Sequence, residues 1–311
     1  MIKKLIKIIG LLICITILFC SCNNLALIDE YYSFVDDNNQ TVTLYSKPQK
    51  VAVLLSSFAE LWKISGGKID ITVNETIERG ICKDNVLLVD DGAGKTINAE
   101  LLASYKPDFI IGSIDIIGHK DAYNLLKNMG APFCLMHVED FNDYLKTLKI
   151  FCDINENEEA YKKYGEELKE SIDALKESTK SKEQQKVMFI RSGSSEASFK
   201  AKSSTEHFAA NMLTELGAIN IADSAEILLD GLNHEEIIKQ NPKYIFVSLM
   251  GNQEAAKKLV EKTLSKPEWQ IIDAVKNNRV IFLEKELFQY KPNHRFFEAY
   301  NFLAKSLYGE N

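Results

Sequence analysis

Hydrophobic and polar residues follow two recurring patterns along the chain, short apolar runs and longer amphipathic stretches. The run KVAVLL at 50–55 is typical of a buried strand, and FAELWKIS at 58–65, followed by Gly66, is typical of a helix with a glycine stop. The alternation continues to about residue 151 and begins again with KVMFIR at 186–191. Because strands that alternate with helices favour parallel sheets, we expect an α/β fold.

A long polar stretch separates the two alternating regions. One apolar stripe runs through it, at spacings of three and four residues: Tyr161, Tyr164, Leu168, Ile172 and Leu175. This periodicity predicts one long helix, and the stripe is too short for a coiled coil. The predicted architecture is two α/β lobes linked by a single long helix, with a ligand cleft between the lobes. The predicted boundaries are 46–153 for the N-terminal lobe, 154–184 for the helix and 185–311 for the C-terminal lobe.

The N-terminus has a different pattern. Three lysines precede an apolar run from Ile8 to Phe19, and small residues and cysteines follow. This order predicts a secretory signal peptide over residues 1–21, because a membrane-spanning helix needs about 20 apolar residues. An uncleaved signal anchor is the alternative.

The end of this segment, Phe19-Cys20-Ser21-Cys22, resembles the lipobox of bacterial lipoproteins, with phenylalanine in place of the usual leucine. The resemblance implies that Cys22 is lipidated and becomes the new N-terminus. We therefore expect residues 22–45 to be a lipid anchor and tether. The protein is then expected on the extracytoplasmic face of the cell membrane, held there through the lipid only.

Charge and cysteine content narrow the function further. The formal net charge is −7, and loss of residues 1–21 removes three lysines and no acidic residue, which leaves −10. Nucleic-acid binding is not expected of so acidic a chain. Among the cysteines beyond the signal, Cys82, Cys134 and Cys152, no CxxC spacing occurs, and pairing of Cys134 with Cys152 stays open.

Three cations follow a predicted strand of the second lobe. Arg191 is the last residue of the run at 186–191, and Lys200 and Lys202 follow it within about ten residues. In open α/β sheets, ligands bind beyond the carboxyl ends of strands, so these cations are candidates to hold an anionic ligand. A solvated loop would explain the same charges.

The segments NAELLASYKPDFIIGS (98–113) and NHEEIIKQNPKYIFVS (233–248) repeat one helix-to-strand unit. In each, an asparagine at the helix cap is followed two residues later by a glutamate, Glu100 or Glu235. The helix dipole favours a carboxylate in the first turn, which explains either copy alone. Matching carboxylates in both lobes suit a clamp that a partner grips from two sides.

Several segments, in this order and spacing, resemble the substrate-binding lipoproteins of ABC importers for iron–siderophore, haem and cobalamin, whose lobes are joined by one rigid helix. They are SKPQKVAVLLSSFAEL, INAELLASYKPDFIIGS, the long polar helix, MLTELGAINIAD, LNHEEIIKQNPKYIFV and FQYKPNHRFFEAYNFLAKSLY. The resemblance covers nearly the whole mature chain. It implies capture of a metal chelate and its delivery to an ABC permease and its ATPase, without chemistry or cofactor. In that class, the glutamates matching Glu100 and Glu235 dock onto permease arginines.

The loops after the strands are expected to line the cleft. The predicted ligand contacts are Ser56, Ser57, Phe58 and Ser113 from the first lobe, and Arg191, Lys200, Lys202, Met250, Phe288 and Tyr290 from the second. Aromatic rings can cover the apolar parts of a chelate, while the cations meet its carboxylate or catecholate oxygens. This mixture favours an anionic ferric siderophore.

Two alternatives stay open. Haem or cobalamin is the first, with Tyr290 or a histidine as an axial ligand of haem. An extracytoplasmic enzyme that uses the cleft is the second, because the same lobes occur in other classes of protein. The five histidines show no HxH or HExxH spacing, so no protein metal site is predicted, and direct ligation of the metal stays open.

Overall fold

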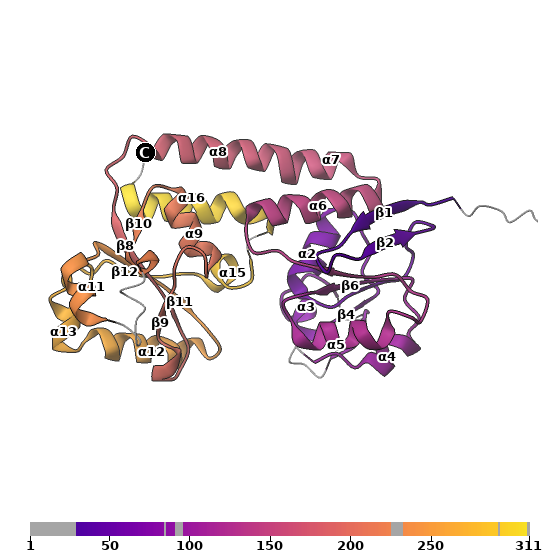
Figure 1. Ribbon diagram of the computed structural model, residues 1–311, viewed down its shortest axis with the longest axis horizontal. Helices are drawn as coiled ribbons and strands as arrows, with labels where there is room; N and C mark the ends of the chain where they lie inside the picture. The colour runs from indigo at the N-terminus through magenta and orange to yellow at the C-terminus, as the bar shows by residue number, and fades with distance from the viewer. Residues whose placement is uncertain (1–28, 84, 91–95, 225–232, 292, 310–311) are drawn as a thin grey trace, which may run out of the picture.

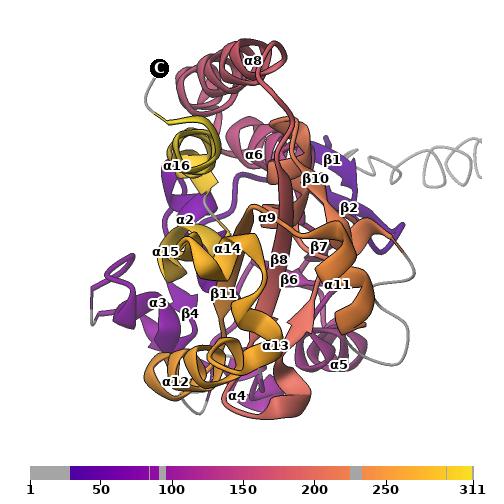
Figure 2. The same ribbon diagram turned by 90° about the vertical axis from the view of Figure 1, so that its left-hand side faces the viewer.

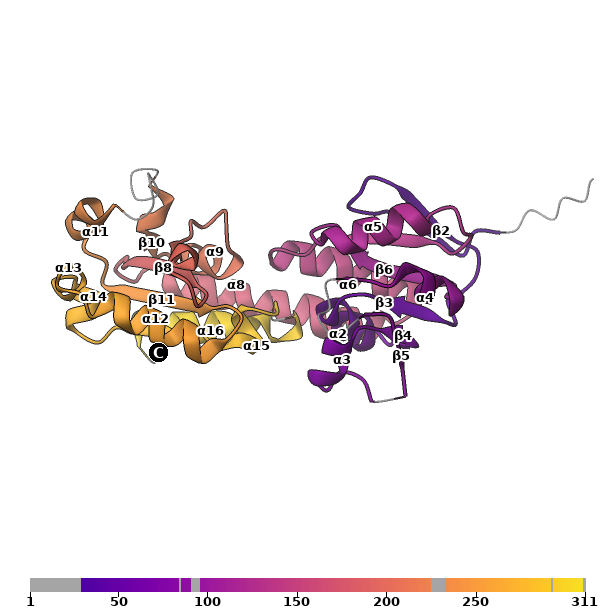
Figure 3. The same ribbon diagram turned by 90° about the horizontal axis from the view of Figure 1, so that it is seen from below.

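The computed structural model describes residues 29–83, 85–90, 96–224, 233–291 and 293–309. Two α/β lobes lie side by side, and a long helical segment runs across both of them on one side (Figure 1). The same two-lobe arrangement is seen from below in Figure 3. The predicted signal peptide and Cys22 lie outside the described residues.

The N-terminal lobe contains a parallel five-stranded sheet in the order β5-β4-β3-β6-β7. Its strands are β3 (Val51–Val53), β4 (Ile71–Thr72), β5 (Leu87–Leu88), β6 (Phe109–Ser113) and β7 (Phe133–Met136). Its helices are α2 (Ser56–Ile64), α3 (Asn74–Glu78), α4 (Ala99–Ser104), α5 (Ile117–Leu126) and α6 (Phe141–Asn155). Strands β3, β6 and β7 are buried along their whole length, as expected of a parallel sheet covered on both faces.

The C-terminal lobe repeats this plan with parallel strands in the order β10-β8-β11-β12, and a short strand β9 pairs antiparallel with β8. Its strands are β8 (Lys186–Ser192), β9 (Lys200–Ala201), β10 (Ile219–Asn220), β11 (Tyr244–Leu249) and β12 (Val280–Phe282). Its α-helices are α9 (Phe208–Glu215), α11 (His234–Gln240), α12 (Gln253–Leu264), α13 (Pro267–Gln270), α14 (Asp273–Lys276), α15 (Lys285–Phe288) and α16 (Phe296–Tyr308). Short 3₁₀ turns lie at η2 (Glu196–Ser198), η3 (Ile221–Asp223) and η4 (Asn293–Arg295).

The connecting helix is built from α7 (Glu158–Tyr161), a π-helical turn η1 (Lys162–Glu166) and α8 (Glu167–Thr179). It begins later than the predicted residue 154, because α6 ends at Asn155 and Glu156 has a left-handed backbone. A Cβ at Gly165 would lie 3.1 Å from the Tyr161 ring, so the π turn brings its backbone close to that side chain. Helix α16 packs along α8, as Figures 1 and 2 both show.

Part of the predicted tether is folded, which corrects the range 22–45. Strands β1 (Tyr32–Val35) and β2 (Thr41–Leu44) form an antiparallel hairpin. The Asp36 carboxylate at the turn accepts a hydrogen bond from the Leu135 amide at 2.9 Å, and Val42 and Leu44 are buried. Burial of these apolar side chains against the first lobe therefore fixes the segment in place.

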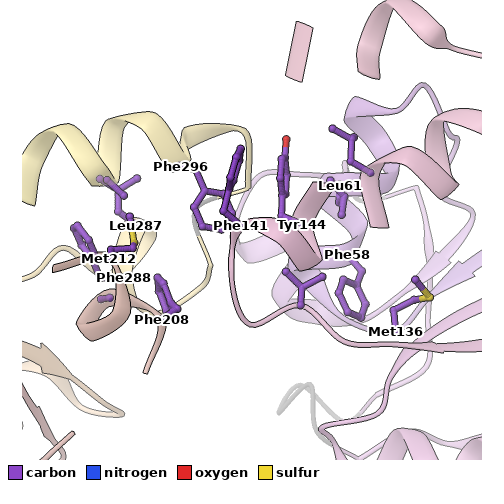
Figure 4. Packing of buried hydrophobic residues seen from close by; sticks show 14 of the residues in the cluster. Phe58, Leu61, Met136, Phe141, Tyr144, Phe208, Met212, Leu287, Phe288 and Phe296 are labelled. Carbon is purple, nitrogen blue, oxygen red and sulfur yellow. The ribbon is translucent and has the colours of Figure 1, made fainter. Parts of the chain in front are cut away.

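The two lobes share one hydrophobic core. Phe141 and Tyr144 of α6 contact Phe296 of α16, with ring centroids 5.1 Å and 5.3 Å apart respectively. Figure 4 shows these three rings between Phe208 and Phe288 on one side and the side chains around Phe58 on the other. The lobes are thus joined by this aromatic contact as well as by the connecting helix.

Candidate functional site

A cavity of about 180 Å³ lies where the carboxyl ends of β3, β6 and β7 meet a segment of the second lobe. Its lining is part apolar and part polar: Leu55, Ser57, Phe58, Ser113, Asp115, Ile116, Val138, Glu139, Lys291 and Asn293. It therefore includes three of the predicted contacts from the first lobe. Ligands of open α/β sheets bind at this edge, which makes the cavity the candidate site.

Ser56 lies deeper than its neighbour Ser57. It is fully buried, and its hydroxyl donates to Glu75 Oε2 at 2.5 Å and accepts from the Arg79 guanidinium at 3.0 Å. Ser56 is therefore occupied inside the lobe in this structure, whereas Ser57 and Phe58 reach the cavity. Both serines lie at the start of α2, shortly after β3. The packing of α2 against α3 decides which of the two hydroxyls faces the cavity.

The segment that follows α15 returns to the first lobe, and we call residues 289–291 and 293–295 the return segment. The Ser57 hydroxyl donates a hydrogen bond to the Tyr290 carbonyl. The Asn293 side-chain amide donates to the Ser57 carbonyl and to Glu60 Oε2, each at 3.1 Å. Predicted ligand contacts from the two lobes, Ser57 and Tyr290, are therefore bonded to each other in this structure.

Arg79 joins the return segment to the first lobe. Its guanidinium lies 4.5 Å from the Tyr290 ring centroid and 2.8 Å from Glu60 Oε2. Burial would raise the pKa of Glu60, but contact with His294 and the charge of Arg79 outweigh it, so the pKa lies below its usual value. Sequence analysis missed this network, because its members come from α2, α3 and a segment more than two hundred residues later.

The predicted cations of the second lobe gather at the end of β8. Arg191 of β8 is the direct antiparallel partner of Lys200 of β9, and both side chains are exposed. Lys202 is paired with Glu206 at 3.0 Å. Neither Arg191 nor Lys200 forms a salt bridge with another residue of the described ranges. Two like charges directly opposite each other on a strand pair repel, so an anion would stabilise this arrangement.

The positive charges in this region lower the pKa of the nearby His207. Burial, followed by the charges of Arg191, Lys291 and Lys202, lowers its pKa from 6.5 to about 3. The neutral ring caps α9, where Nδ1 accepts a hydrogen bond from the Ala209 amide at 3.1 Å. Lys291, which was not among the predicted contacts, therefore belongs to the same positive region as Arg191.

The other predicted contacts of the second lobe lie at different depths. Met250 follows β11 and is half-buried, with its amide bonded to the Ser192 carbonyl. Phe288 is 1% exposed and packs against Phe302, so it is a core residue in this structure. The Tyr290 ring lies under Arg79 and also 4.4 Å from the Lys285 ammonium.

The two repeated glutamates lie on the surface of different lobes. Glu100 is in the first turn of α4 and Glu235 in the first turn of α11. Both are exposed, and neither is hydrogen-bonded or ion-paired to another side chain in the part of the chain that the structure describes. The asparagines before them cap the helices, as expected: Asn98 accepts from the Leu101 amide and Asn233 from the Glu236 amide.

Three further observations concern metals, thiols and membranes. Within the described ranges, no group of three or more His, Cys, Asp or Glu side chains is arranged to hold a metal ion. Cys82, Cys134 and Cys152 are free thiols, so Cys134 and Cys152 do not pair in this structure. Among the residues described, no helix is long and apolar enough to cross a bilayer.

Comparison with known proteins identifies the family. A family model described as periplasmic binding protein matches residues 51–287, which is most of the chain. The chain belongs to the periplasmic binding protein family. Proteins of this family are substrate-binding transport proteins and not enzymes, and solved structures with this fold include a siderophore binding protein, a heme complex and a vitamin B12 binding protein. This confirms the predicted family, the α/β two-lobe fold and the absence of an enzymatic role.

Solved structures share the fold and differ in ligand. SirA of Staphylococcus aureus complexed with staphyloferrin B has a TM-score of 0.69 and 19% identity, covering 89% of this chain and 98% of that one. IsdE of S. aureus complexed with heme has a TM-score of 0.66 and 18% identity, and the match covers 83% of this chain and 98% of that one. The vitamin B12 binding protein BtuF of Vibrio cholerae has a TM-score of 0.64 and 16% identity, and the match covers 84% of this chain and 97% of that one. Comparison with curated protein sequences gives no significant match.

Proposed function

We propose that this periplasmic binding protein captures an anionic metal chelate, most favourably a ferric siderophore, between its lobes and delivers it to an ABC permease. The mature protein is held at the extracytoplasmic face of the membrane by a lipid on Cys22. The relatives bind ligands of several classes, so the choice among them rests on the charges of this cleft.

The observation that carries the choice of an anionic ligand is the pairing of Arg191 with Lys200. Their exposed side chains oppose each other across β8 and β9, and the described residues supply no carboxylate to either. Charge-assisted hydrogen bonds from such cations to carboxylate or catecholate oxygens are among the stronger polar contacts in proteins. A bound anion would therefore remove the repulsion and gain those bonds.

The apolar part of the cleft fits the body of a chelate. Leu55, Phe58, Ile116 and Val138 line the cavity beside Ser113. At about 180 Å³, the cavity is smaller than the roughly 300–1,000 Å³ typical of small-molecule pockets. A ferric siderophore would therefore extend from the cavity toward β8 and β9, where the cations lie.

Titration of the soluble domain, residues 23–311 without the lipid anchor, with ferric siderophores, haemin and cobalamin tests the proposal. We expect quenching of Trp62 and Trp269 fluorescence by a negatively charged ferric chelate. Tight haemin binding with a Soret shift, and no binding of siderophores, would overturn the choice of ligand.

A charge-neutralising double variant tests the cations themselves. Arg191→Gln with Lys200→Gln should weaken an anionic chelate by about a hundredfold or more, since each of the two lost charge-assisted bonds is worth about 1.5–3 kcal/mol, and should leave an uncharged chelate nearly unaffected. The matched control is Lys262→Gln with Lys266→Gln, which removes two exposed cations at the end of α12. Equal losses for both chelates would mean that the two cations only support the loop.

A further inference from the structure

Lys291 of the return segment forms an ion pair across the two lobes. Its ammonium lies 2.5 Å from Oε2 of Glu139, which follows β7 in the first lobe. Both residues line the candidate cavity. The Lys291 side chain is 23% exposed and that of Glu139 is 46% exposed, so solvent and ligand can reach the pair.

The surroundings of Lys291 on the second lobe are positive and aromatic. Its ammonium lies 4.7 Å from the Phe208 ring centroid, and it acts on His207 together with Arg191 and Lys202. Glu139 is therefore a carboxylate of the first lobe that lies beside positively charged residues of the second lobe.

The other acidic residue of the cavity is already engaged within the first lobe. Asp115 contacts His137 Nδ1 at 2.9 Å and accepts from Ser113. Burial would lower the pKa of His137, but the hydrogen bond to Asp115 and the charges of Asp115, Asp143 and Glu139 raise it, which favours the charged ring. Asp115 thus contacts a cation of its own lobe directly, whereas the direct ion-pair partner of Glu139 among the described residues is Lys291 of the opposite lobe.

We propose that Glu139 occupies, in the ligand-free protein, the place on Lys291 that an anionic oxygen of the chelate takes when the ligand binds. This inference rests on the proposed function and adds Lys291 as a ligand-binding residue and Glu139 as an internal competitor. Binding exchanges one ion pair for another and opens the bridge between the lobes at this point. No covalent step is involved.

The proposal predicts an effect opposite to that of most substitutions in a binding site. Glu139→Gln keeps the shape of the side chain and removes the competing charge. It should tighten the binding of a negatively charged ferric tris-catecholate by about two- to fivefold, because a partly exposed ion pair is worth up to about 1 kcal/mol. Binding of an uncharged ferric tris-hydroxamate should stay the same.

Lys291→Gln should weaken the tris-catecholate by about tenfold. In the Lys291→Gln background, Glu139→Gln should give no further gain, because the competition needs both partners. Glu254→Gln is the control for net charge, since this glutamate lies on α12 in an exposed pair with Lys258. Glu139→Ala removes the same charge by truncation and gives a second measure.

Isothermal titration of the mature chain with both chelates distinguishes the outcomes. A weaker or unchanged affinity in both Glu139 variants would overturn the inference and leave the proposed function intact, since Glu139 would then be only a structural bridge. A gain that persists without Lys291 would also overturn it. If the wild-type chain bound no anionic chelate, the proposed function itself would fall, which is a different result from either of these.

Discussion

In the first lobe, Asn98 caps α4, which leads through a left-handed turn into β6; in the second, Asn233 caps α11, which leads through the same turn into β11. The turn residue has φ 50° at Lys106 and φ 46° at Asn241. A buried proline follows each turn, and each strand then lies in the interior of its sheet, with a neighbouring strand on both sides. The two units thus share their backbone path.

Different side chains stabilise that path in each lobe. The carboxylate of Asp108 accepts hydrogen bonds from the Gln49 and Lys50 amides at the first turn. At the second turn, the Asn241 side chain accepts from the Asp273 amide at 2.9 Å. The comparison shows that the shared backbone path needs the asparagine cap and the left-handed turn residue. The side chains that hydrogen-bond around the turn differ between the lobes.

Two further Asn-x-Glu caps show how far helix capping alone explains these glutamates. Asn252 caps α12 by accepting from the Ala255 amide, and Glu254 is then in the first turn. Glu254 pairs with Lys258 at 2.6 Å, whereas Glu100 and Glu235 have no such partner in the described parts of the chain. Asn157 caps α7 in the same way, and Glu159 in its first turn is likewise exposed and without an ion pair among the described residues. Helix capping therefore accounts for all four glutamates, and the proposal that Glu100 and Glu235 dock a partner rests on their matching places in the two lobes.

The largest expected effect concerns these two glutamates. If Glu100 and Glu235 dock the permease, Glu100→Ala with Glu235→Ala should reduce import of the ligand by about tenfold or more, because both lobes would lose a docking contact, while ligand affinity stays at the wild-type value. Each exposed charge pair is individually weak, so both must be changed together. Uptake assays and titration measure the two quantities.

Glu254→Ala is the matched control, since it removes a glutamate from the same helical position. Each of the three substitutions should lower the free energy of unfolding by only about 0.3–1 kcal/mol through the helix dipole. Wild-type import by the double variant would show that the glutamates are capping residues alone.

The histidines of the two lobes should respond to acid in opposite ways. His207 in the second lobe has a pKa of about 3, below its ordinary 6.5, so below pH 6.5 the unfolded chain binds a proton that the folded chain does not. Stability is therefore lost as pH falls, by about 2 kcal/mol between pH 7 and pH 5. His207→Asn, which keeps a capping side chain, should remove this loss in urea unfolding.

His137 in the first lobe serves as the comparison, because its pKa is raised. Its stabilising effect is complete below pH 6.5 and is lost as pH rises through the folded-state pKa. His137→Gln should therefore lower stability at pH 5 more than at pH 8. If both substitutions changed the pH dependence of stability in the same direction, the opposite pKa shifts of His207 and His137 would be contradicted.

The smallest effects concern the left-handed turns. Asn241→Lys should destabilise by about 1–2 kcal/mol, because lysine is strained there and the hydrogen bond from the Asp273 amide is lost. Lys106→Asn should stabilise by about 0.5 kcal/mol, since asparagine tolerates this backbone better. Urea unfolding measures both, and equal effects of opposite sign would mean that the side-chain bond contributes nothing.

Local patterns predicted most of the fold, because helices and strands leave a period in the sequence. The helix stop at Gly66 is an example, since its φ of 97° suits glycine. The hairpin at 32–44 was missed although its second strand alternates, Thr41-Val42-Thr43-Leu44, because the segment was interpreted as a tether. A period of two was therefore available there and would have predicted the strand.

The candidate site was harder to predict, because it depends on contacts between distant parts of the chain. Loops after strands were a sound guide to Ser57, Phe58 and Ser113, which line the cavity. Sequence alone carries no signal that joins Glu139 to Lys291, 152 residues apart. The burial of Phe288 likewise depends on the position of α16, which no local pattern gives.

The aromatic contact of Phe141 and Tyr144 with Phe296 has a consequence for how the molecule folds. Because this cluster joins α6 to α16, the last helix completes the core that the first lobe begins. Each lobe has one core cluster of its own, but the cluster around α6 and α16 is complete only when both lobes are folded, so calorimetry should give a single cooperative transition with equal calorimetric and van't Hoff enthalpies. A chain released by synthesis from its N-terminus would reach its stable state only after its last residues emerge.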